Sequence, residues 1–300
     1  MVGFLLLSSL SSVASAQTIP TVAAADTLSA QQKRNRQLVL SGGFVAGYAV
    51  SLKLLSDAWY KQYPRTHFHF YDDSKHWKQM DKAGHFWTAF HESRIGVDAL
   101  RWAGTSEKKA IWFGSMLGLA LQTPIEVLDG LSQEYGFSNS DMVANAAGSA
   151  AVLGQQLAWG EIRLMPKFSF HRTEYSTTRL ESLGNSYVGQ MLKDYNGQTY
   201  WLSVDIYRFL PQDTRYPKWL NVAVGYSAEG MVVGDPMLNR EVGQRPFRKF
   251  YLSPDLNLTG IPTRSKVLKK LFYVASIFRI PAPALEYSNR HGLVFRPLYY

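Results

Sequence analysis

Three long stretches in the N-terminal half of this 300-residue sequence contain no Asp, Glu, Lys or Arg. They cover residues 37–52, 110–125 and 142–160. Their content of Ala, Gly and Leu is typical of helices, but each is shorter than the roughly 20 apolar residues that a membrane-spanning helix needs. We therefore expect either a soluble helical core or helices embedded at a membrane with their polar groups turned inward.

The fold class expected from these stretches is mainly α, with a bundle of about four helices over residues 37–165. The expected helices cover residues 38–55, 81–102, 109–131 and 141–164. Beyond Pro166 the helical periodicity fades. Residues 166–300 are expected to form a less regular, basic and aromatic-rich α+β region with a few antiparallel strands. Segments 198–210 and 217–234 fit either a short helix or a strand, and the chain is expected to end in a hairpin.

The first residues predict export. "VGFLLLSSLSSVASA" is a short apolar run that ends in Ala14-Ser15-Ala16, an A-x-A cleavage pattern. We expect residues 1–16 to be a signal peptide and residues 17–36 to be a flexible lead-in. The sequence contains no Cys. No disulfide is therefore expected, and no lipid-modified cysteine can follow the cleavage site.

The positive charge is concentrated in the second half of the chain. Residues 1–160 hold 13 basic and 12 acidic residues, and residues 161–300 hold 19 and 11, so the second half supplies +8 of the net +9. On an exported protein, a basic surface of this kind favours membrane lipid headgroups or an envelope polymer as partners. A solvated basic face without a partner is the alternative. Nucleic acid is not expected, because no nucleic-acid-binding motif accompanies the charge.

Three successive expected helices each carry a polar pair at i, i+4 spacing on an otherwise apolar face. The pairs are Asp81 with His85, Gln122 with Glu126, and Asp141 with Asn145. Asp129 follows Glu126 on the same face, and Glu92 extends the stripe of Asp81 and His85. Carboxylates do not enter apolar interiors unpaired, because desolvation disfavours their charged form. We therefore expect a compact cluster of Asp81, His85, Glu126, Asp129, Asp141 and Asn145.

Several segments resemble a known protein family. "MDKAGHF", "QTPIEVLDGLSQEYGFSNSDMVANAAG" and "DYNGQTYWLS" look like the YfiM-like family of predicted periplasmic lipoproteins, a domain of unknown function. The order D-K-x-x-H-F, E-x-x-D and F-S-x-x-D-x-x-A-N-x-x-G is more distantly similar to VanZ-like membrane proteins. The positions that carry this similarity are Asp81, Lys82, His85, Phe86, Glu126, Asp129, Asp141, Asn145 and Gly148. The lipoprotein label does not transfer to a chain without Cys.

Histidine and carboxylates at these spacings suit either a divalent metal or general acid–base catalysis. The candidate metal ligands are His85, Glu126 and Asp129, and the metal itself is not identified by the sequence. A second candidate metal site is the histidine-rich loop "THFHFYDDSKH", with His67, His69 and His76 near Asp72 and Asp73. Surface aromatics at a membrane interface explain that loop equally well.

Each candidate also has a structural interpretation. Asp81 and Asp141 lie near expected helix starts, where an acid caps backbone amides. The order Thr123-Pro124-Ile125-Glu126 matches a capping box with Pro at the first helical position. In that interpretation Glu126 only caps the start of its own helix. A buried histidine such as His85 is more often a satisfied core residue than a ligand.

These features lead to two hypotheses for an exported protein of the periplasm or the outer membrane. In the first, the chain is a membrane-associated structural or binding protein, and the polar cluster fixes the register of its helices. In the second, it is a membrane-associated enzyme that acts on an envelope lipid or cell-wall precursor through the cluster. The common sequence motifs of hydrolases and of nucleoside triphosphatases are absent from the sequence.

Overall fold

The chain divides into two units of different architecture. The computed structural model describes residues 28–61, 63–175, 183–184, 186–211 and 213–300. The first unit, here called the helical unit, comprises the chain up to Asp72, Thr88–Glu161 and Ser265–Lys270. The second, called the sheet unit, comprises Asp73–Trp87, Ile162–Arg264 and Leu271–Tyr300. Each unit is described by itself.

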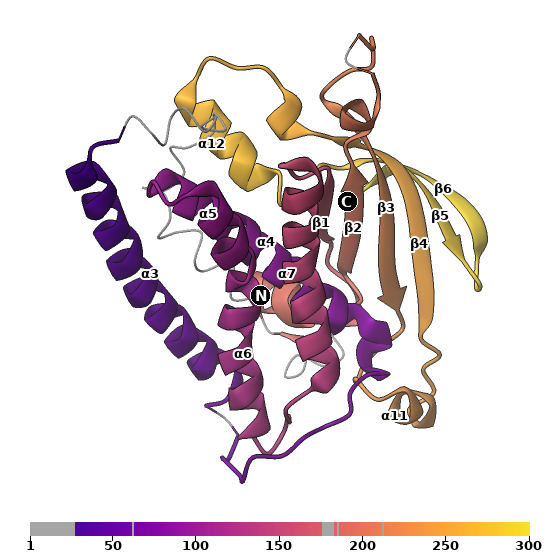
Figure 1. Cartoon of the computed structure of the whole chain (residues 1–300). Coiled ribbons are helices and arrows are strands. Elements are labelled where there is room, and N and C mark those ends of the chain that lie inside the picture. The colour runs from indigo at the N-terminus through magenta and orange to yellow at the C-terminus, as the bar shows by residue number, and fades with distance from the viewer. Residues whose placement is uncertain (1–27, 62, 176–182, 185, 212) are drawn as a thin grey trace. The chain divides into compact units, whose positions relative to one another are not determined.

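The helical unit is built from long helices. They are α3 (Ala30–Trp59), the larger part of α4 (Met80–Trp102), α5 (Glu107–Ser115), α6 (Leu117–Gly130) and α7 (Asn139–Trp159) (Figure 1). A capping box starts α3, where Ser29 Oγ accepts the N–H of Gln32 at 3.2 Å and Gln32 Oε1 accepts the N–H of Ser29 at 2.9 Å. Ser138 caps the start of helix α7, since its Oγ accepts the N–H of Asp141 at 3.1 Å.

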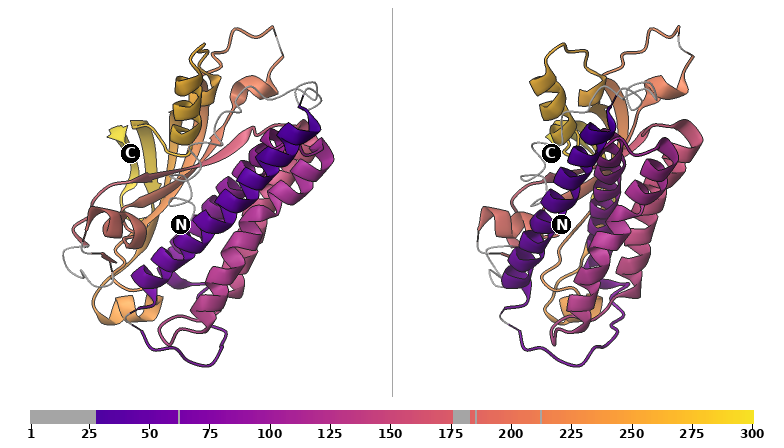
Figure 2. Two further views of the ribbon diagram at one scale, coloured as in Figure 1. Left: turned by 90° about the vertical axis from the view of Figure 1, so that its left-hand side faces the viewer. Right: turned by 60° about the vertical axis from the view of Figure 1, so that its left-hand side comes forward.

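Helix α3 lies alongside α6 in the views of Figure 1 and Figure 2. A small apolar core joins the two helices. It contains the buried Leu121 and Ile125 of α6 and the partly buried Phe44, Tyr48, Leu52 and Leu55 of α3. Tyr48 Oη also donates to the carbonyl oxygen of Leu121 at 2.7 Å. This contact uses one stripe of α3 and leaves most of the helix surface exposed.

Helices α4 and α6 approach so closely that their crossing requires a glycine. A Cβ atom at Gly118 of α6 would lie 2.0 Å from the carbonyl oxygen of Ala89 on α4. Gly114 of α5 makes a similar approach, since its Cβ would lie 2.4 Å from the backbone nitrogen of Val97. Backbones this close place polar side chains of neighbouring helices within hydrogen-bonding distance of one another.

The sheet unit contains a six-stranded antiparallel sheet in the order β1-β2-β3-β4-β5-β6 (Figure 1). The strands are β1 (Leu164–Phe170), β2 (Gln198–Val204), β3 (Leu220–Glu229), β4 (Phe247–Leu256), β5 (Ala282–Ser288) and β6 (Gly292–Tyr299). The short helices are α10 (Tyr187–Lys193), α11 (Pro236–Glu241) and α12 (Lys266–Ala275), and α12 begins in the helical unit. Every strand pairs with the next along the chain, so the topology is a meander.

The sheet is rolled so that one of its faces, here called the inner face, is enclosed. Trp201, Ala223, Tyr251 and Ala284 of this face form one buried cluster. Thr199 Oγ1 on β2 lies 3.1 Å from Tyr299 Oη on β6. Strands β2 and β6 are four strand spacings apart, about 19 Å in a flat sheet, so this contact requires strong curvature. Gly225 makes room for Trp201, because a Cβ there would lie 2.6 Å from the indole ring.

The expectation of a mainly α chain organised around a four-helix bundle is wrong, because the molecule is a mixed α+β protein. Both ambiguous segments, 198–210 and 217–234, contain full strands of the sheet. The expected helix 109–131 is two helices that meet at Met116, and 141–164 is helical only to Trp159. The first helix begins at Ala30 rather than Leu38, inside the expected lead-in. The expected signal peptide, 1–16, lies outside the described residues.

Candidate functional site

The six predicted site residues are divided between the two units. Asp81 and His85 lie on the first turns of α4 in the sheet unit. The helical unit holds Glu126 and Asp129 on α6 and Asp141 and Asn145 on α7. Each group is described within its own unit, and a single cluster of all six residues stays a prediction.

In the sheet unit, Asp81 belongs to an ion-pair group with two other residues. Lys82 Nζ lies 2.8 Å from Asp81 Oδ2 and 2.7 Å from Asp73 Oδ2. The Asp81 and Asp73 carboxylates have oxygens within 4.8 Å of each other. Because the ammonium group lies against both carboxylates, it offsets part of their mutual repulsion. His85, one turn after Asp81, is half-buried.

The backbone that leads into α4 is strained. Trp77, Lys78 and Gln79 have φ angles of 47°, 51° and 65°, in the left-handed region that non-glycine residues rarely adopt. The rest of the sheet unit holds this turn in place. The N–H of Trp77 donates to the carbonyl oxygen of Gly234 at 2.9 Å, and the hydroxyl of Tyr226 on β3 donates to the carbonyl oxygen of Lys78. Such over-determined strain is common near functional sites, and here it fixes the position of Asp81 in the first turn of α4.

In the helical unit, the most deeply buried acid of α4 is Glu92. Its side chain is 4% exposed, and Gln122 Nε2 of α6 donates to Glu92 Oε2 at 2.8 Å. Burial raises the pKa of Glu92 to about 7, and the bond from Gln122 only partly opposes this rise. The carboxyl group therefore titrates near neutral pH. The sequence predicted Glu92 only as an extension of the Asp81 stripe, so its pairing with Gln122 was missed.

Two buried serines next to this pair cap the start of α6. Ser93 Oγ of α4 accepts the N–H of Gly118 at 3.1 Å, and Ser149 Oγ of α7 accepts the N–H of Leu119 at 2.9 Å. The two hydroxyl oxygens lie 3.0 Å apart. The helix-initiating residue Met116 offers no side-chain cap of its own, so the neighbouring helices satisfy the first amides of α6. Ser149 could have been found from sequence, since it continues the i, i+4 stripe of Asp141 and Asn145.

Two of the predicted site residues, Glu126 of α6 and Asp141 of α7, lie close together in the helical unit. The side chains are 1% and 5% exposed, and carboxylate oxygens of the two lie within 4.8 Å of each other. Glu126 Oε2 also accepts the N–H of Ser138, at 3.4 Å. Asn145, one turn after Asp141, is fully buried. Two buried carboxylates within this distance have the geometry to hold a bound cation between them.

The alternative interpretation of Glu126 as part of a capping box is wrong. Helix α6 begins at Leu117 and runs through Pro124, so Thr123 is not at a helix start. Its hydroxyl instead donates to the carbonyl oxygen of Leu119 at 2.7 Å. This bond is typical of a hydroxyl inside a helix. Glu126 is therefore held by tertiary contacts rather than by a local cap.

Asp129, a predicted metal ligand, has a different partner. Tyr60 Oη donates to Asp129 Oδ1 at 2.8 Å. Burial, together with the neighbouring Asp129 carboxylate, raises the pKa of Tyr60, so its hydroxyl stays protonated. Among the described residues, the sets of potential metal ligands contain Glu126 and Asp141 but not Asp129. The assignment of Asp129 as a metal ligand stays a prediction.

Among the described residues, no group of three potential metal ligands includes His67, His69 or His76 of the histidine-rich loop, and the second metal site stays a prediction. His69 Nε2 lies 2.9 Å from the carbonyl oxygen of Tyr135, while His67 is exposed. Phe68 and Phe70 of the same loop pack on Phe137, with ring centroids 5.6 Å and 5.2 Å away. The loop is thus held by aromatic packing and backbone contacts.

One comparison with known proteins gives a match. A family described as predicted periplasmic lipoproteins of unknown function (DUF2279) matches residues 69–155, less than a third of the chain. No curated protein and no solved structure matches the chain. The match does not by itself confirm the resemblance to YfiM-like or VanZ-like proteins. It supports an exported, periplasmic protein, and the segment from the histidine-rich loop into α7 is similar to a domain whose function is unknown.

Proposed function

We propose that this chain is an envelope protein that is held at a membrane by α3 and serves there as a structural or binding protein facing the periplasm. The observation that carries the proposal is the exposure of α3. Residues Ala30–Asp57 are long and apolar enough to cross a membrane, yet only 6% of the most apolar window is buried. Leu38, Val39, Val45 and Val50 are 56–66% exposed. A helix of a soluble core would cover these side chains.

A second segment passes the same test of length and composition. It covers Glu107–Gly130, and 44% of its most apolar window is buried. Because this segment consists of α5 and α6, whose buried residues contact α4 and α7, it is as well explained by helix packing as by lipid. The proposal therefore rests on α3. Lys33, Arg34 and Arg36 precede its apolar part and suit contact with anionic headgroups.

The test is co-flotation of the full chain with phospholipid vesicles. We expect wild-type protein to float, and the double variant Leu38→Lys/Val45→Lys to lose about tenfold or more in affinity, because two charges would enter the apolar region. Gln37→Lys adds a charge at an exposed polar position of the same helix and should float like wild type. Wild-type protein that stays at the bottom of the gradient, or a double variant that floats equally well, would contradict the proposal.

A second candidate function is an enzyme that acts on an envelope lipid or cell-wall precursor. The observation that favours it is the Glu126–Asp141 pair, which offers two buried carboxylates for acid–base chemistry or for a divalent metal. Thermal unfolding with added Mg²⁺, Mn²⁺ or Zn²⁺ tests this function. A metal bound by the pair should raise the melting temperature of the wild type but not of Glu126→Gln or Asp141→Asn. Equal shifts in all three proteins would exclude the pair as a metal site.

A further inference from the structure

We propose that the outer face of the six-stranded sheet is a second lipid-contacting surface, which places its apolar side chains among the acyl chains of an anionic phospholipid bilayer. The outer face means the exposed residues of β2 to β6 that alternate with the inner face. Phe168 of β1 and Tyr200 of β2 have the same orientation but are buried, so they are not part of it. The inference deepens the proposed function and rests on membrane association, but it concerns the sheet unit and is independent of α3.

An unbroken row of apolar side chains crosses five strands of the outer face. Direct cross-strand partners run from Leu202 to Val224, Leu252, Leu285 and Phe295. Their exposed fractions lie between 36% and 61%. A second row runs beside it through Tyr226, Phe250, Tyr287 and Leu293. The last three members of this row are 48–70% exposed. A soluble antiparallel sheet normally turns its polar face to water, so this sheet has the reverse arrangement.

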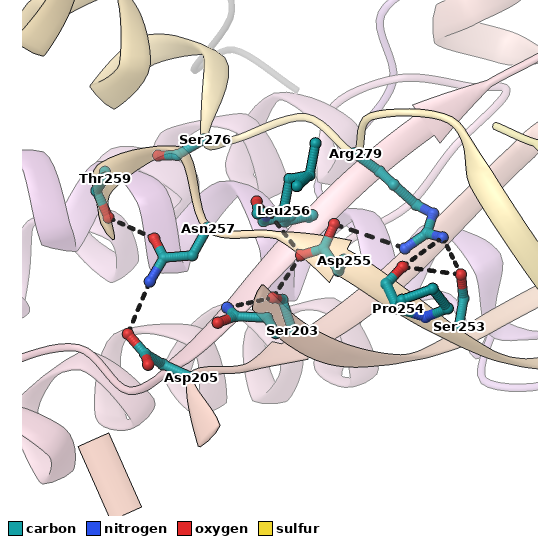
Figure 3. A network of polar contacts seen from close by, with 12 residues as sticks. Ser203, Asp205, Ser253, Pro254, Asp255, Leu256, Asn257, Thr259, Ser276 and Arg279 are labelled. Atoms are coloured by element: carbon teal, nitrogen blue, oxygen red, sulfur yellow. Dashed lines mark hydrogen bonds and ion pairs between the residues drawn. The ribbon is translucent and has the colours of Figure 1, made fainter. Parts of the chain in front are cut away.

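The inner face, in contrast, is buried and encloses charged and polar groups beside the aromatic cluster around Trp201. Lys167 Nζ lies 2.6 Å from Asp255 Oδ2, and Asn221 Nδ2 donates to Ser203 Oγ. Ser203 Oγ in turn donates to Asp255 Oδ2 (Figure 3). The guanidinium group of Arg279 lies 3.6 Å from Asp255 Oδ1.

Arg279 also packs over the Trp201 ring, 3.7 Å from its centroid. Charged groups that a soluble protein would place outside are thus enclosed. Apolar-out and polar-in alternation is the pattern of strands whose outer side meets hydrocarbon.

The surroundings of the apolar rows suit a bilayer with anionic headgroups. Trp219, immediately before β3, is 45% exposed, and Phe209, after β2, is 47% exposed. Aromatic side chains at the edge of an apolar band are typical of the membrane interface. The exposed basic residues of the β2–β3, β3–β4 and β5–β6 connections are Arg208, Arg215, Lys218, Arg240, Arg245 and Arg290. The exposed acidic residues of the same connections, among those described, are Asp213 and Glu241.

This charge distribution decides between lipid and a second copy of the chain. If two copies packed through their outer faces, basic connections would lie close to basic connections, and their repulsion would oppose association. On a bilayer, anionic headgroups would instead attract the basic connections, while the acyl chains would contact the apolar rows. The occupant that the observations favour is therefore an anionic lipid surface.

The test uses the absence of cysteine from the chain, which allows one fluorophore to be attached at a chosen site. An environment-sensitive label is placed on Val224→Cys or on Leu252→Cys, with Asn289→Cys in the β5–β6 turn as the control. On adding vesicles of phosphatidylethanolamine and phosphatidylglycerol, we expect a several-fold rise in emission at 224 and 252. Lipids with a nitroxide on the acyl chain should quench both labels. The label at 289, beside Arg290 at the level of the headgroups, should not be quenched by the acyl-chain nitroxide.

A matched pair of variants tests the energetic contribution of the rows. Val224→Lys/Leu285→Lys should weaken vesicle affinity about tenfold or more in a chain that retains α3, because two charges would enter the apolar face. Asn289→Lys adds charge at the exposed turn and should not weaken binding. Circular dichroism checks that each variant is folded.

The outcomes separate this inference from the proposed function. A chain that floats with vesicles while the labels at 224 and 252 stay unchanged would overturn the inference and leave the role of α3 intact. The label emission could instead rise without lipid as the protein concentration increases, with a dimer in sedimentation. That result would show that a second copy of the chain covers the outer face, and it would also overturn the inference. Undiminished flotation of Leu38→Lys/Val45→Lys, with the label response at 224 and 252 retained, would support the sheet and contradict the role of α3.

Discussion

At the scale of single residues, Glu92 makes stability depend on pH. Its folded pKa of about 7 lies above the ordinary value of 4.5. A raised carboxyl pKa means that the folded state holds the proton more tightly than the unfolded state. Stability from this group is therefore lost as pH rises from about 4.5 to about 7 and changes little above that range. We predict that Glu92→Gln gains stability relative to wild type across this window, by on the order of 1–3 kcal/mol.

The measurement is urea unfolding of both proteins between pH 4.5 and pH 8. Glu134→Gln, at an exposed position, serves as the control and should follow the wild type at every pH. If the difference between Glu92→Gln and wild type does not change with pH, the buried carboxyl group does not titrate in this range.

At the scale of elements, the crossing of α4 and α6 makes a prediction about glycine. Replacing Gly in a helix by Ala normally stabilises it by roughly 0.5–1 kcal/mol. A Cβ atom at Gly154 of α7 would have nothing within 4 Å, so Gly154→Ala should show this gain. At Gly118 the new methyl group would collide with the backbone of Ala89. We therefore predict that Gly118→Ala loses about 1–3 kcal/mol or more, because the two helices must separate.

Thermal unfolding of the two variants in mild detergent measures both effects. The pair is informative because each substitution adds the same methyl group to a helix. Equal changes at the two positions would mean that the backbones of α4 and α6 are not in close contact.

The helices were more predictable than the sheet for a physical reason. Helix α4 and the start of α7 follow from apolar periodicity and from the cap at Ser138, and they agree closely with expectation. The strands of the sheet carry charged, polar and small side chains, together with Trp201 and Tyr251, on the buried face, and mostly apolar side chains on the exposed face. Burial could not be inferred from that alternation, because the usual rule assigns apolar residues to the interior. The segments around β2 and β3 therefore stayed ambiguous between helix and strand.

At the scale of the whole molecule, the candidate site was only partly predictable. The i, i+4 rule placed Glu126 and Asp141 on facing helices, and the structure brings their carboxylates together. It could not show that Asp129 faces Tyr60 or that Glu92 pairs with Gln122, because those contacts depend on the rotation of each helix. The prediction of lipid headgroups as partners rested on basic charge, and the uncharged stretch 37–52, now part of α3, already allowed a helix at a membrane. The exposed apolar face of the sheet is the feature that the sequence did not predict.

The central claim is that the protein is held at a membrane through apolar surfaces, and the most direct measurement is extraction of membranes from cells that produce the full chain. The membranes are washed first with high salt, then with alkaline carbonate, and finally with detergent. Salt removes proteins held only by charge. We predict that the chain stays with the membrane through both washes and is released by detergent. Recovery of the chain in the soluble fraction, or its release by salt alone, would contradict the account.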